Sequence, residues 1–318
     1  MLKMKQCCVG IDIGGTTVKC GLFTLEGELL DKWEVPTRKE DSGQHILPDV
    51  AKKLKEKLAD HGLTADELKG IGMGVPGPVM PDGCVEVCVN LGWHDCWPAR
   101  EMQKLMGAEI RCEAANDANV AALGEMWQGG GKGCSNVVAV TLGTGVGGGV
   151  VINGHVIAGV HGLGGELGHI HVRDEEKEFC NCGGRGCLEQ VASATGIARE
   201  ARRNMAASTQ PSALRKFGDK VTAKNVCDCA NDGDSMAMET LDTACRYLGL
   251  AMAYVTHIVD PEVFVIGGGV SRAGKILTDL TMKHYEEFTP VSKKKAGIVL
   301  ASLGNDAGIY GAARMVLD

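Results

Sequence analysis

Runs of apolar residues along the chain predict short buried strands that end in glycine turns. The first run, Cys7 to Ile13, ends at Gly14-Gly15, and two further runs follow it, Thr17 to Leu25 and, beyond the turn at Glu26-Gly27, one that extends through Val35. Apolar runs of this length, bounded by glycine, are typical of strands joined as hairpins. We therefore expect the amino-terminal part to open with a β-meander whose first turn is rich in glycine.

The same order of features returns about 130 residues later. An apolar run from Asn136 to Leu142 leads into Gly143-Thr144-Gly145, then into the run Val146 to Ile152, the hairpin turn Asn153-Gly154, and a further strand from His155. Two copies of strand, glycine turn, strand, tight turn and strand favour an internal duplication. Because glycine is abundant in this chain, a chance resemblance between the two copies is the alternative.

Apolar positions at steps of three and four residues predict helices between the strands. Such a stripe covers Ile46 to Leu58, and a longer one covers Ser235 to Asp260. The short segment Asn305 to Val316 is rich in Ala and Gly, which suits a closely packed helix. Residues Ala206 to Lys220 are mixed and contain a proline, and we expect a surface loop there.

Charge and composition exclude several classes of protein. The chain has 33 Lys and Arg against 40 Asp and Glu, a net charge of −7, which argues against a nucleic-acid-binding protein. Residues Met1 to Gln6 hold no apolar signal segment, so the 14 cysteines are expected to be reduced or metal-bound thiols in the cytoplasm. The uncharged stretch Ser135 to Gly165 is interrupted by polar residues and is expected to form strands and turns, not a membrane span.

Cys180, Cys182 and Cys187 lie close together in the sequence, and His169 lies eleven residues before the first of them. Three thiolates and one imidazole form a closed tetrahedral zinc site, and the glycines between the cysteines allow the backbone to fold around the metal. Three unrelated buried cysteines are the alternative. Cys227-Asp228-Cys229 is a weaker second candidate for metal binding.

The segment Asp12 to Lys19 places a carboxylate at a strand end, followed by two glycines and two threonines. Exposed backbone N–H groups and hydroxyls in one turn favour anion binding, although an ordinary glycine hairpin is the alternative. Gly143-Thr144-Gly145 and Gly267-Gly268-Gly269 are two further turns at strand ends, and three such turns suit a nucleoside triphosphate. The residues from Gly143 to Gly148 match a dinucleotide fingerprint, but a strand follows where that fold requires a helix.

Polar residues near these turns are further candidates for the site. Asn116 and Asp117 precede an Ala-rich segment and could cap its helix. Glu166 and Glu189 flank the predicted zinc ligands in the sequence. They either orient those ligands or face a ligand pocket, and their spacing alone favours neither role.

These motifs in this order resemble the ROK family (repressor, open reading frame, kinase), most closely its bacterial glucokinase branch. The resemblance covers nearly the whole chain and includes Asn90-Leu91-Gly92-Trp93 and Glu166-Leu167-Gly168-His169. It implies an α/β fold with two duplicated hexokinase/actin-like (ribonuclease H-like) domains around a central cleft. We expect a small domain at 1–115, a large domain with the zinc site at 116–304, and a final helix at about 305–318 that packs back onto the small domain.

The resemblance also implies the chemistry, which is ATP-dependent phosphorylation of glucose with Mg²⁺, a step of glycolysis. Asp117 would be the general base, Asp12 would hold Mg²⁺, and His169 would bind both the structural Zn²⁺ and the sugar. The remaining sugar ligands would be Gly77, Asn116, Glu166 and Glu189, together with Asp117 itself. The ATP-binding residues would be Gly14, Gly15, Thr16, Thr17, Lys19, Gly143, Thr144, Gly145, Gly267 and Gly268.

Two alternatives to a glucose kinase remain. The first is a kinase of an N-acetylhexosamine, N-acetylmannosamine or N-acetylglucosamine. The second is a sugar-sensing repressor, which is disfavoured because only about six residues precede the first strand and leave no room there for a helix-turn-helix. The family further implies a homodimer or homotetramer, with neither a nucleic-acid nor a membrane partner.

Overall fold

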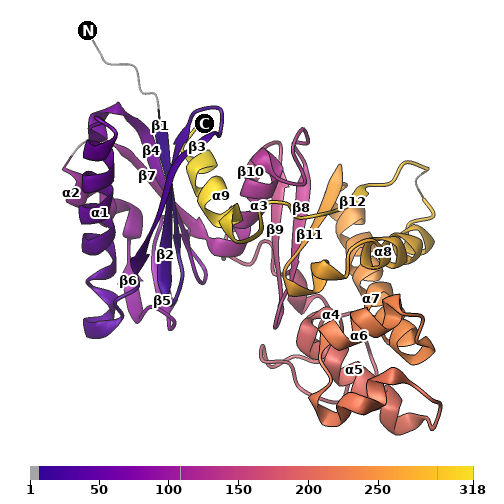
Figure 1. Ribbon diagram of the computed structural model, residues 1–318. Coiled ribbons are helices and arrows are strands. Elements are labelled where there is room, and N and C mark those ends of the chain that lie inside the picture. Colours follow the sequence, from indigo (N-terminus) through magenta and orange to yellow (C-terminus); the bar gives the residue numbers. More distant parts are fainter. Residues whose placement is uncertain (1–6, 108, 292, 318) are drawn as a thin grey trace. The chain divides into compact units, whose positions relative to one another are not determined.

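A computed structural model describes residues 7–107, 109–291 and 293–317 of the chain (Figure 1). The chain divides into two compact units, each of mixed α/β structure. Unit 1 comprises Met1–Gly133, Gly149–Gly165 and Ser302–Asp318, and unit 2 comprises Cys134–Gly148 and Glu166–Ala301. These units differ in their bounds from the expected domains 1–115 and 116–304, which remain a prediction.

The first sheet has five strands in the order β3-β2-β1-β4-β7. The antiparallel meander predicted from the apolar runs consists of β1 (Cys7–Ile13), β2 (Thr17–Thr24) and β3 (Leu29–Pro36). On the other side of β1, β4 (Leu68–Val75) pairs in parallel with β1, and β7 (Arg111–Asn116) pairs in parallel with β4. Parallel neighbours place the carboxyl ends of β1, β4 and β7 at one edge of the sheet.

The second sheet repeats this arrangement, in the order β10-β9-β8-β11-β12. Its strands are β8 (Val137–Leu142), β9 (Val146–Ile152), β10 (His155–Val156), β11 (Val263–Gly267) and β12 (Gly297–Leu300). Here too a three-stranded meander comes first and two parallel strands are then added beside its first strand. The matching strand order confirms the predicted internal duplication.

The helices and short elements complete the two units (Figure 1). Those of unit 1 are η1 (Glu40–Gly43), α1 (Ile46–Asp60), η2 (Ala65–Glu67), the hairpin β5 (Val85–Cys88) and β6 (Trp93–Cys96), α2 (Pro98–Met106), α3 (Asp117–Gln128), η6 (Gly304–Asp306) and α9 (Ala307–Met315). Those of unit 2 are η3 (Leu167–His169), α4 (Glu189–Ala192), α5 (Ala194–Ala207), η4 (Ala213–Lys220), α6 (Ala223–Asn231), α7 (Ser235–Val259), η5 (Gly269–Ala273) and α8 (Lys275–Phe288).

The structure corrects one prediction and confirms another. The expected surface loop at 206–220 contains the 3-10 helix η4, because Ser212 caps its start by accepting a hydrogen bond from the Leu214 N–H. The uncharged stretch 135–165 forms strands and turns, as expected. No helix in the described part of the chain combines the length and the apolar character that crossing a membrane requires.

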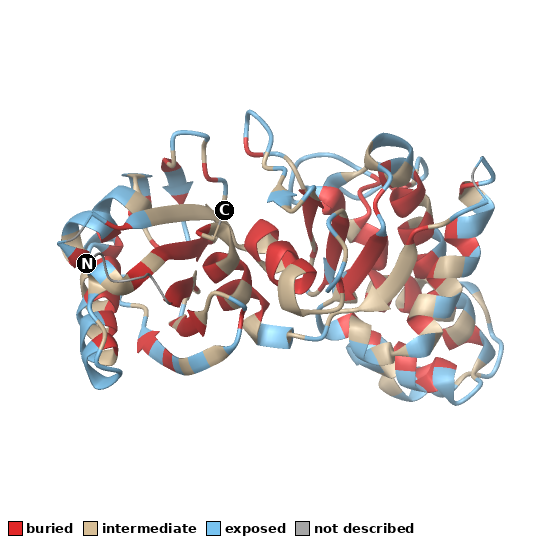
Figure 2. Cartoon of the chain, turned by 90° about the horizontal axis from the view of Figure 1, so that it is seen from above, coloured by how far each residue is buried: buried red, intermediate tan, exposed pale blue. Residues whose placement is uncertain are grey.

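The core of unit 1 is packed from both faces of its sheet (Figure 2). Apolar residues of α1 and α2 pack against one face. The small-residue helix α9 packs against β1 and β4, as its composition predicts. At Gly10 and Gly72 an added Cβ would overlap the carbonyl oxygens of Ile309 and Ala312, so glycine in the strands lets the α9 backbone approach closely.

Replacing Gly72 with Ala is expected to lower the free energy of unfolding by roughly 1–3 kcal/mol, because the new methyl group would overlap the α9 backbone and not a side chain that could turn away. Gly297→Ala is the matched control, since a Cβ there would make an ordinary 3.6 Å contact with Val263. Urea unfolding curves measure both variants. Equal midpoints for the two would contradict the close approach of α9 to the sheet.

Candidate functional site

The junction between β7 and α3 holds the first group of site residues. Asn116 is the N-cap of α3, and its side-chain oxygen accepts hydrogen bonds from the N–H groups of Ala118 at 3.0 Å and Asn119 at 3.2 Å. Its amide nitrogen donates to the Gly77 carbonyl at 3.1 Å. Asn116 is therefore the helix cap that the sequence suggested, and it also joins the turn Pro76-Gly77-Pro78, which follows β4, to the start of α3.

Two carboxylates lie near each other beside this helix start. The Asp117 carboxylate accepts a hydrogen bond from the Ala118 N–H at 2.8 Å. Burial raises the pKa of Asp12 to about 6, and the negative charge of Asp117 contributes to the rise, while Lys19 opposes it. Asp12 lies near the end of β1, where the glycine at 308 in α9 leaves room for its carboxyl group.

These carboxylates fit a divalent cation. Mg²⁺ prefers oxygen ligands and is usually held by one or two carboxylates together with substrate phosphates. The negative charge of Asp117 opposes ionisation of Asp12, and a bound cation would offset that unfavourable interaction. The residues predicted for Mg²⁺ and for the general base thus lie close enough to interact.

Without Mg²⁺, the Asp12 carboxyl is expected to make unfolding pH-dependent. Its pKa is about 6 in the folded chain and near 3.8 when unfolded, so the folded state binds the proton more tightly. The contribution of this group to the free energy of unfolding is fully present below about pH 4 and is lost as the pH rises through about 6. The total loss is roughly 3 kcal/mol. Asp12→Asn should remove that decline, which the difference between wild-type and variant urea unfolding at several pH values measures. A constant difference would contradict it.

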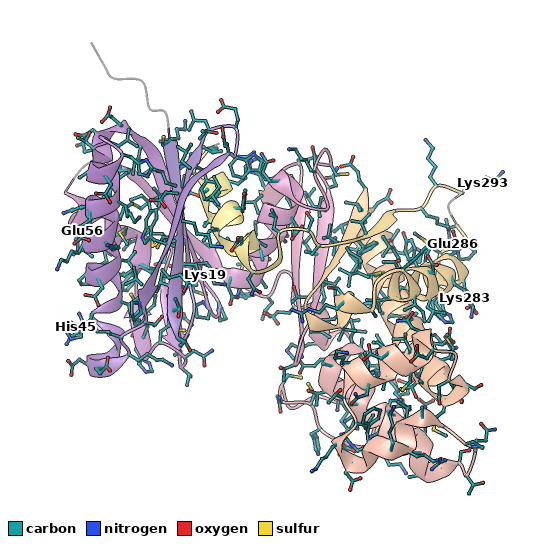
Figure 3. The ribbon with its side chains drawn as sticks, viewed as in Figure 1. Lys19, His45, Glu56, Lys283, Glu286 and Lys293 are labelled. Carbon is teal, nitrogen blue, oxygen red and sulfur yellow. The ribbon has the colours of Figure 1, made fainter. Side chains whose placement is uncertain are left out.

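The glycine turn after β1 is held in place by Thr37. The Thr37 hydroxyl donates to the Gly14 carbonyl at 2.7 Å, and its N–H donates to the Thr16 carbonyl at 3.0 Å. The Lys19 side chain, labelled in Figure 3, donates to the Asn305 carbonyl at 3.0 Å. The ammonium group of Lys39 lies beside Gly15, where an added Cβ would be 3.8 Å from it. Sequence reasoning missed Lys39, because it belongs to no motif and reaches the turn only through the fold.

The corresponding turn in unit 2 is tied to Glu189. The Gly143 N–H donates to the Gly145 carbonyl at 2.9 Å. The Glu189 carboxylate accepts a hydrogen bond from the Val146 N–H at 3.0 Å and occupies the space that a side chain at Gly145 would need. Glu189, which follows the cysteine cluster in the sequence, therefore connects that cluster to this turn. In the third turn, Gly268 has a φ of +84° and packs against the Leu142 backbone, next to the end of β8.

The cysteine cluster has the geometry of a metal site. His169, Cys180, Cys182 and Cys187 place one ligand atom each within 4.8 Å of one another. The sulfurs of Cys182 and Cys187 are 3.6 Å apart, and the Cys180 sulfur is 3.8 Å from His169 Nδ1. Tetrahedral zinc with Zn–S of about 2.3 Å and Zn–N of about 2.0 Å requires ligand separations of about 3.5–3.8 Å. The donor set and its spacing both fit zinc.

Two carboxylates adjoin this cluster. Glu189 Oε1 lies 3.7 Å from the Cys180 sulfur. His169 presents Nδ1 to Cys180 and Nε2 to Glu166, whose Oε2 is 3.8 Å away. Glu166 and His169 are exposed, so this ring nitrogen and this carboxylate are accessible to a ligand. The weaker candidates Cys227 and Cys229 are buried in α6 and lie outside the cluster.

Comparison with known proteins places the chain among sugar kinases. Residues 8–318 match the ROK family. A glucokinase of Halalkalibacterium halodurans is 44% identical over 97% of this chain and 94% of its own, and an N-acetyl-D-glucosamine kinase of Vibrio atlanticus is 31% identical over 96% and 97%. The solved ROK hexokinase of Thermus thermophilus is 31% identical, with a TM-score of 0.80 over 97% of each chain. This chain and the Thermus thermophilus hexokinase share the hexokinase/actin-like fold that the sequence predicted. The chain therefore belongs to the ROK family.

Proposed function

We propose that the protein transfers the γ-phosphoryl group of ATP to glucose and forms glucose 6-phosphate. The observation that carries the proposal is the pair of neighbouring carboxylates, Asp117 at the start of α3 and Asp12 at the end of β1, next to a glycine turn suited to phosphate. The 44% identity to a glucokinase supports glucose as the sugar.

Asp117 is the proposed general base. Its carboxylate would take the proton from the sugar 6-hydroxyl as that oxygen attacks the phosphorus, and the bond to ADP would break. Phosphoryl transfer passes through a loose transition state, so the protein mainly positions the reactants and neutralises charge. The Ala118 N–H holds one Asp117 oxygen at 2.8 Å, which limits rotation of the carboxylate.

The sugar ligands proposed besides Asp117 are Gly77, Asn116, Glu166, His169 and Glu189. A carboxylate accepts hydrogen bonds from two adjacent hydroxyls, which suits Glu166 and Glu189 to a hexose. His169 would bind the sugar through Nε2, because Nδ1 faces the cysteines. Zinc, when bound, would fix the imidazole ring and stabilise the loop, and it would stay away from the reacting phosphate.

The phosphates of ATP would lie on the glycine turns. Gly14 to Thr17 and Gly143 to Gly145 are proposed to offer backbone N–H groups and hydroxyls, with Gly267 and Gly268 near the nucleoside. Lys19 remains a proposed phosphate ligand, and we propose Lys39, whose ammonium group lies beside Gly15, as a second one. Mg²⁺, when bound by Asp12, would neutralise phosphate charge.

A coupled assay of ADP release tests the choice of sugar. With equal concentrations of glucose, mannose, fructose, N-acetylglucosamine and N-acetylmannosamine, we expect the highest kcat/KM for glucose. A higher value for an N-acetylhexosamine would favour the alternative that the Vibrio atlanticus relative suggests.

Subunit number and location complete the proposal. We propose a homodimer or homotetramer in the cytoplasm. All 14 cysteines are free thiols, and cysteines stay reduced in a reducing compartment such as the cytoplasm, which supports this location. Sedimentation of the purified protein would give the subunit number.

A further inference from the structure

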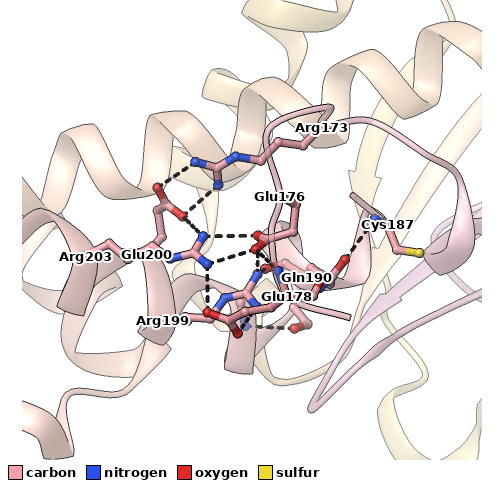
Figure 4. A network of polar contacts seen from close by, with 10 residues as sticks. Arg173, Glu176, Glu178, Cys187, Gln190, Arg199, Glu200 and Arg203 are labelled. Atoms are coloured by element: carbon pink, nitrogen blue, oxygen red, sulfur yellow. Dashed lines mark hydrogen bonds and ion pairs between the residues drawn. The ribbon is translucent and has the colours of Figure 1, made fainter. Parts of the chain in front are cut away.

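The loop that carries Cys180 is anchored to helix α5 by one buried carboxylate (Figure 4). The side chain of Glu176 is 0% exposed and lies between Arg199 and Arg203 of α5. Arg199 donates to its Oε2 at 2.8 Å, and Arg203 donates to both oxygens, at 2.9 and 3.1 Å. The Glu178 N–H donates to Oε1 at 3.2 Å. Three donors from helix α5 and one from the loop itself thus surround this carboxylate and hold the loop to the helix.

The same network also reaches Cys187, the last cysteine of the cluster, through Gln190. Arg199 donates to the Gln190 carbonyl at 2.7 Å with the same guanidinium group that binds Glu176. The Gln190 side chain accepts a hydrogen bond from the Cys187 N–H at 3.2 Å and donates to the Glu178 carbonyl at 3.0 Å. Gln190 therefore links Cys187, one of the predicted zinc ligands, to the backbone of Glu178, which lies two residues before Cys180.

A buried charge network of this kind contributes more to the spacing of the groups that it joins than to the free energy of folding. Buried ion pairs pay a large desolvation cost, and apolar side chains of similar volume often hold a helix in place equally well. The guanidinium group, however, is planar and donates in fixed directions, so it sets the distance between the groups that it joins. Here the groups joined are backbone and side-chain atoms on both sides of the cysteine cluster.

We propose that Glu176, Arg199 and Gln190 form a positioning frame that sets the spacing of Cys180 and Cys187. The frame fixes the affinity of the cluster for zinc without contacting the metal. It also fixes the orientation of Glu189, the neighbour of Gln190 in α4, and, through the Cys180 sulfur that faces His169 Nδ1, the orientation of His169. That second effect rests on the proposed function, because it concerns the sugar.

Glu176→Gln tests the frame, because it keeps the side-chain volume and removes the charge that Arg199 and Arg203 share. Residues that orient metal ligands typically contribute 10–100-fold to metal affinity. We expect zinc affinity, measured by competition with a chromophoric chelator, to fall by about that factor. The KM for glucose should rise, whereas the kcat at saturating glucose should change little.

Tyr285→Phe is the matched control in unit 2. It removes one hydrogen bond, between Tyr285 and Thr256 at 2.9 Å, from the fully buried Tyr285 side chain. It should lower the thermal midpoint and leave zinc affinity unchanged. If Glu176→Gln lowers the midpoint but keeps the parental zinc affinity, the network is merely structural and the proposal is overturned.

The two proposals fail differently. A fall in zinc affinity with an unchanged KM for glucose supports the frame and contradicts the proposed role of His169 and Glu189 in sugar binding. If Glu176→Gln does not fold, Gln190→Met decides the question, because it keeps all charges and removes only the contacts to Cys187 and Glu178. Parental zinc affinity in that variant overturns the frame, and reduced affinity supports it.

Discussion

Asp117→Asn is expected to lower kcat by about 10²–10⁴-fold, the contribution typical of a general base. Asparagine has the size of aspartate, and its amide oxygen can keep the hydrogen bond from the Ala118 N–H. The start of α3 and the binding of glucose should therefore be retained. The amide, however, cannot take the hydroxyl proton. Turnover is measured in a coupled assay, and glucose binding is measured by calorimetry.

Glu113→Gln provides the control for this variant. Glu113 lies on the same strand, β7, and its carboxylate pairs with the Arg111 side chain at 2.7 Å on the surface. Loss of that charge should leave kcat at the parental value. If Asp117→Asn also kept turnover within a few-fold of the parent, Asp117 would be only a residue of the helix start, and the proposed base would be wrong.

Removal of zinc is expected to weaken glucose binding at least tenfold and to lower the thermal midpoint, with ATP binding comparatively intact. His169 presents Nδ1 to the cysteines and Nε2 to Glu166, so an unanchored ring would lose its orientation toward the sugar. The phosphate turn after β1 is held by Thr37, which does not depend on the metal loop. Calorimetry with glucose and with a non-hydrolysable ATP analogue, before and after chelation, measures both affinities.

Two cysteine variants separate loss of zinc from loss of a thiol. Cys187→Ser removes one ligand of the cluster and should reproduce the effect of chelation. Cys229→Ser changes a buried cysteine of α6 outside the cluster and should keep zinc and the affinity for glucose. A zinc-free protein with unchanged affinity for glucose would show that the metal does not position the sugar ligands.

The sequence predicted the parts of the fold that depend on local pattern. The strands β1, β8 and β9 are apolar runs bounded by glycine, and the duplication follows from their repeated order. The hairpin of β5 and β6 was missed, because these strands are only four residues long and carry exposed residues. The close approach of α9 to β1 and β4 also depends on which strands pair, which no local pattern determines.

The candidate site divides in the same way. The zinc ligands were predictable, because three of them lie within eight residues and the chemistry of the metal restricts the donor types. Lys39 and the frame of Glu176, Arg199 and Gln190 were not, because each contact joins residues that share no motif and meet only in the folded chain. The raised pKa of Asp12 likewise required the burial that only the fold supplies.

In the proposed reaction the γ-phosphoryl group passes from ATP to the 6-hydroxyl of glucose. Phosphorus NMR of the protein with ATP, Mg²⁺ and glucose follows this transfer. We expect the γ-phosphate resonance to be replaced by the phosphomonoester resonance of glucose 6-phosphate, and ADP to accumulate in equal amount. Accumulation of inorganic phosphate with ADP, or an ATP spectrum that does not change, would contradict it.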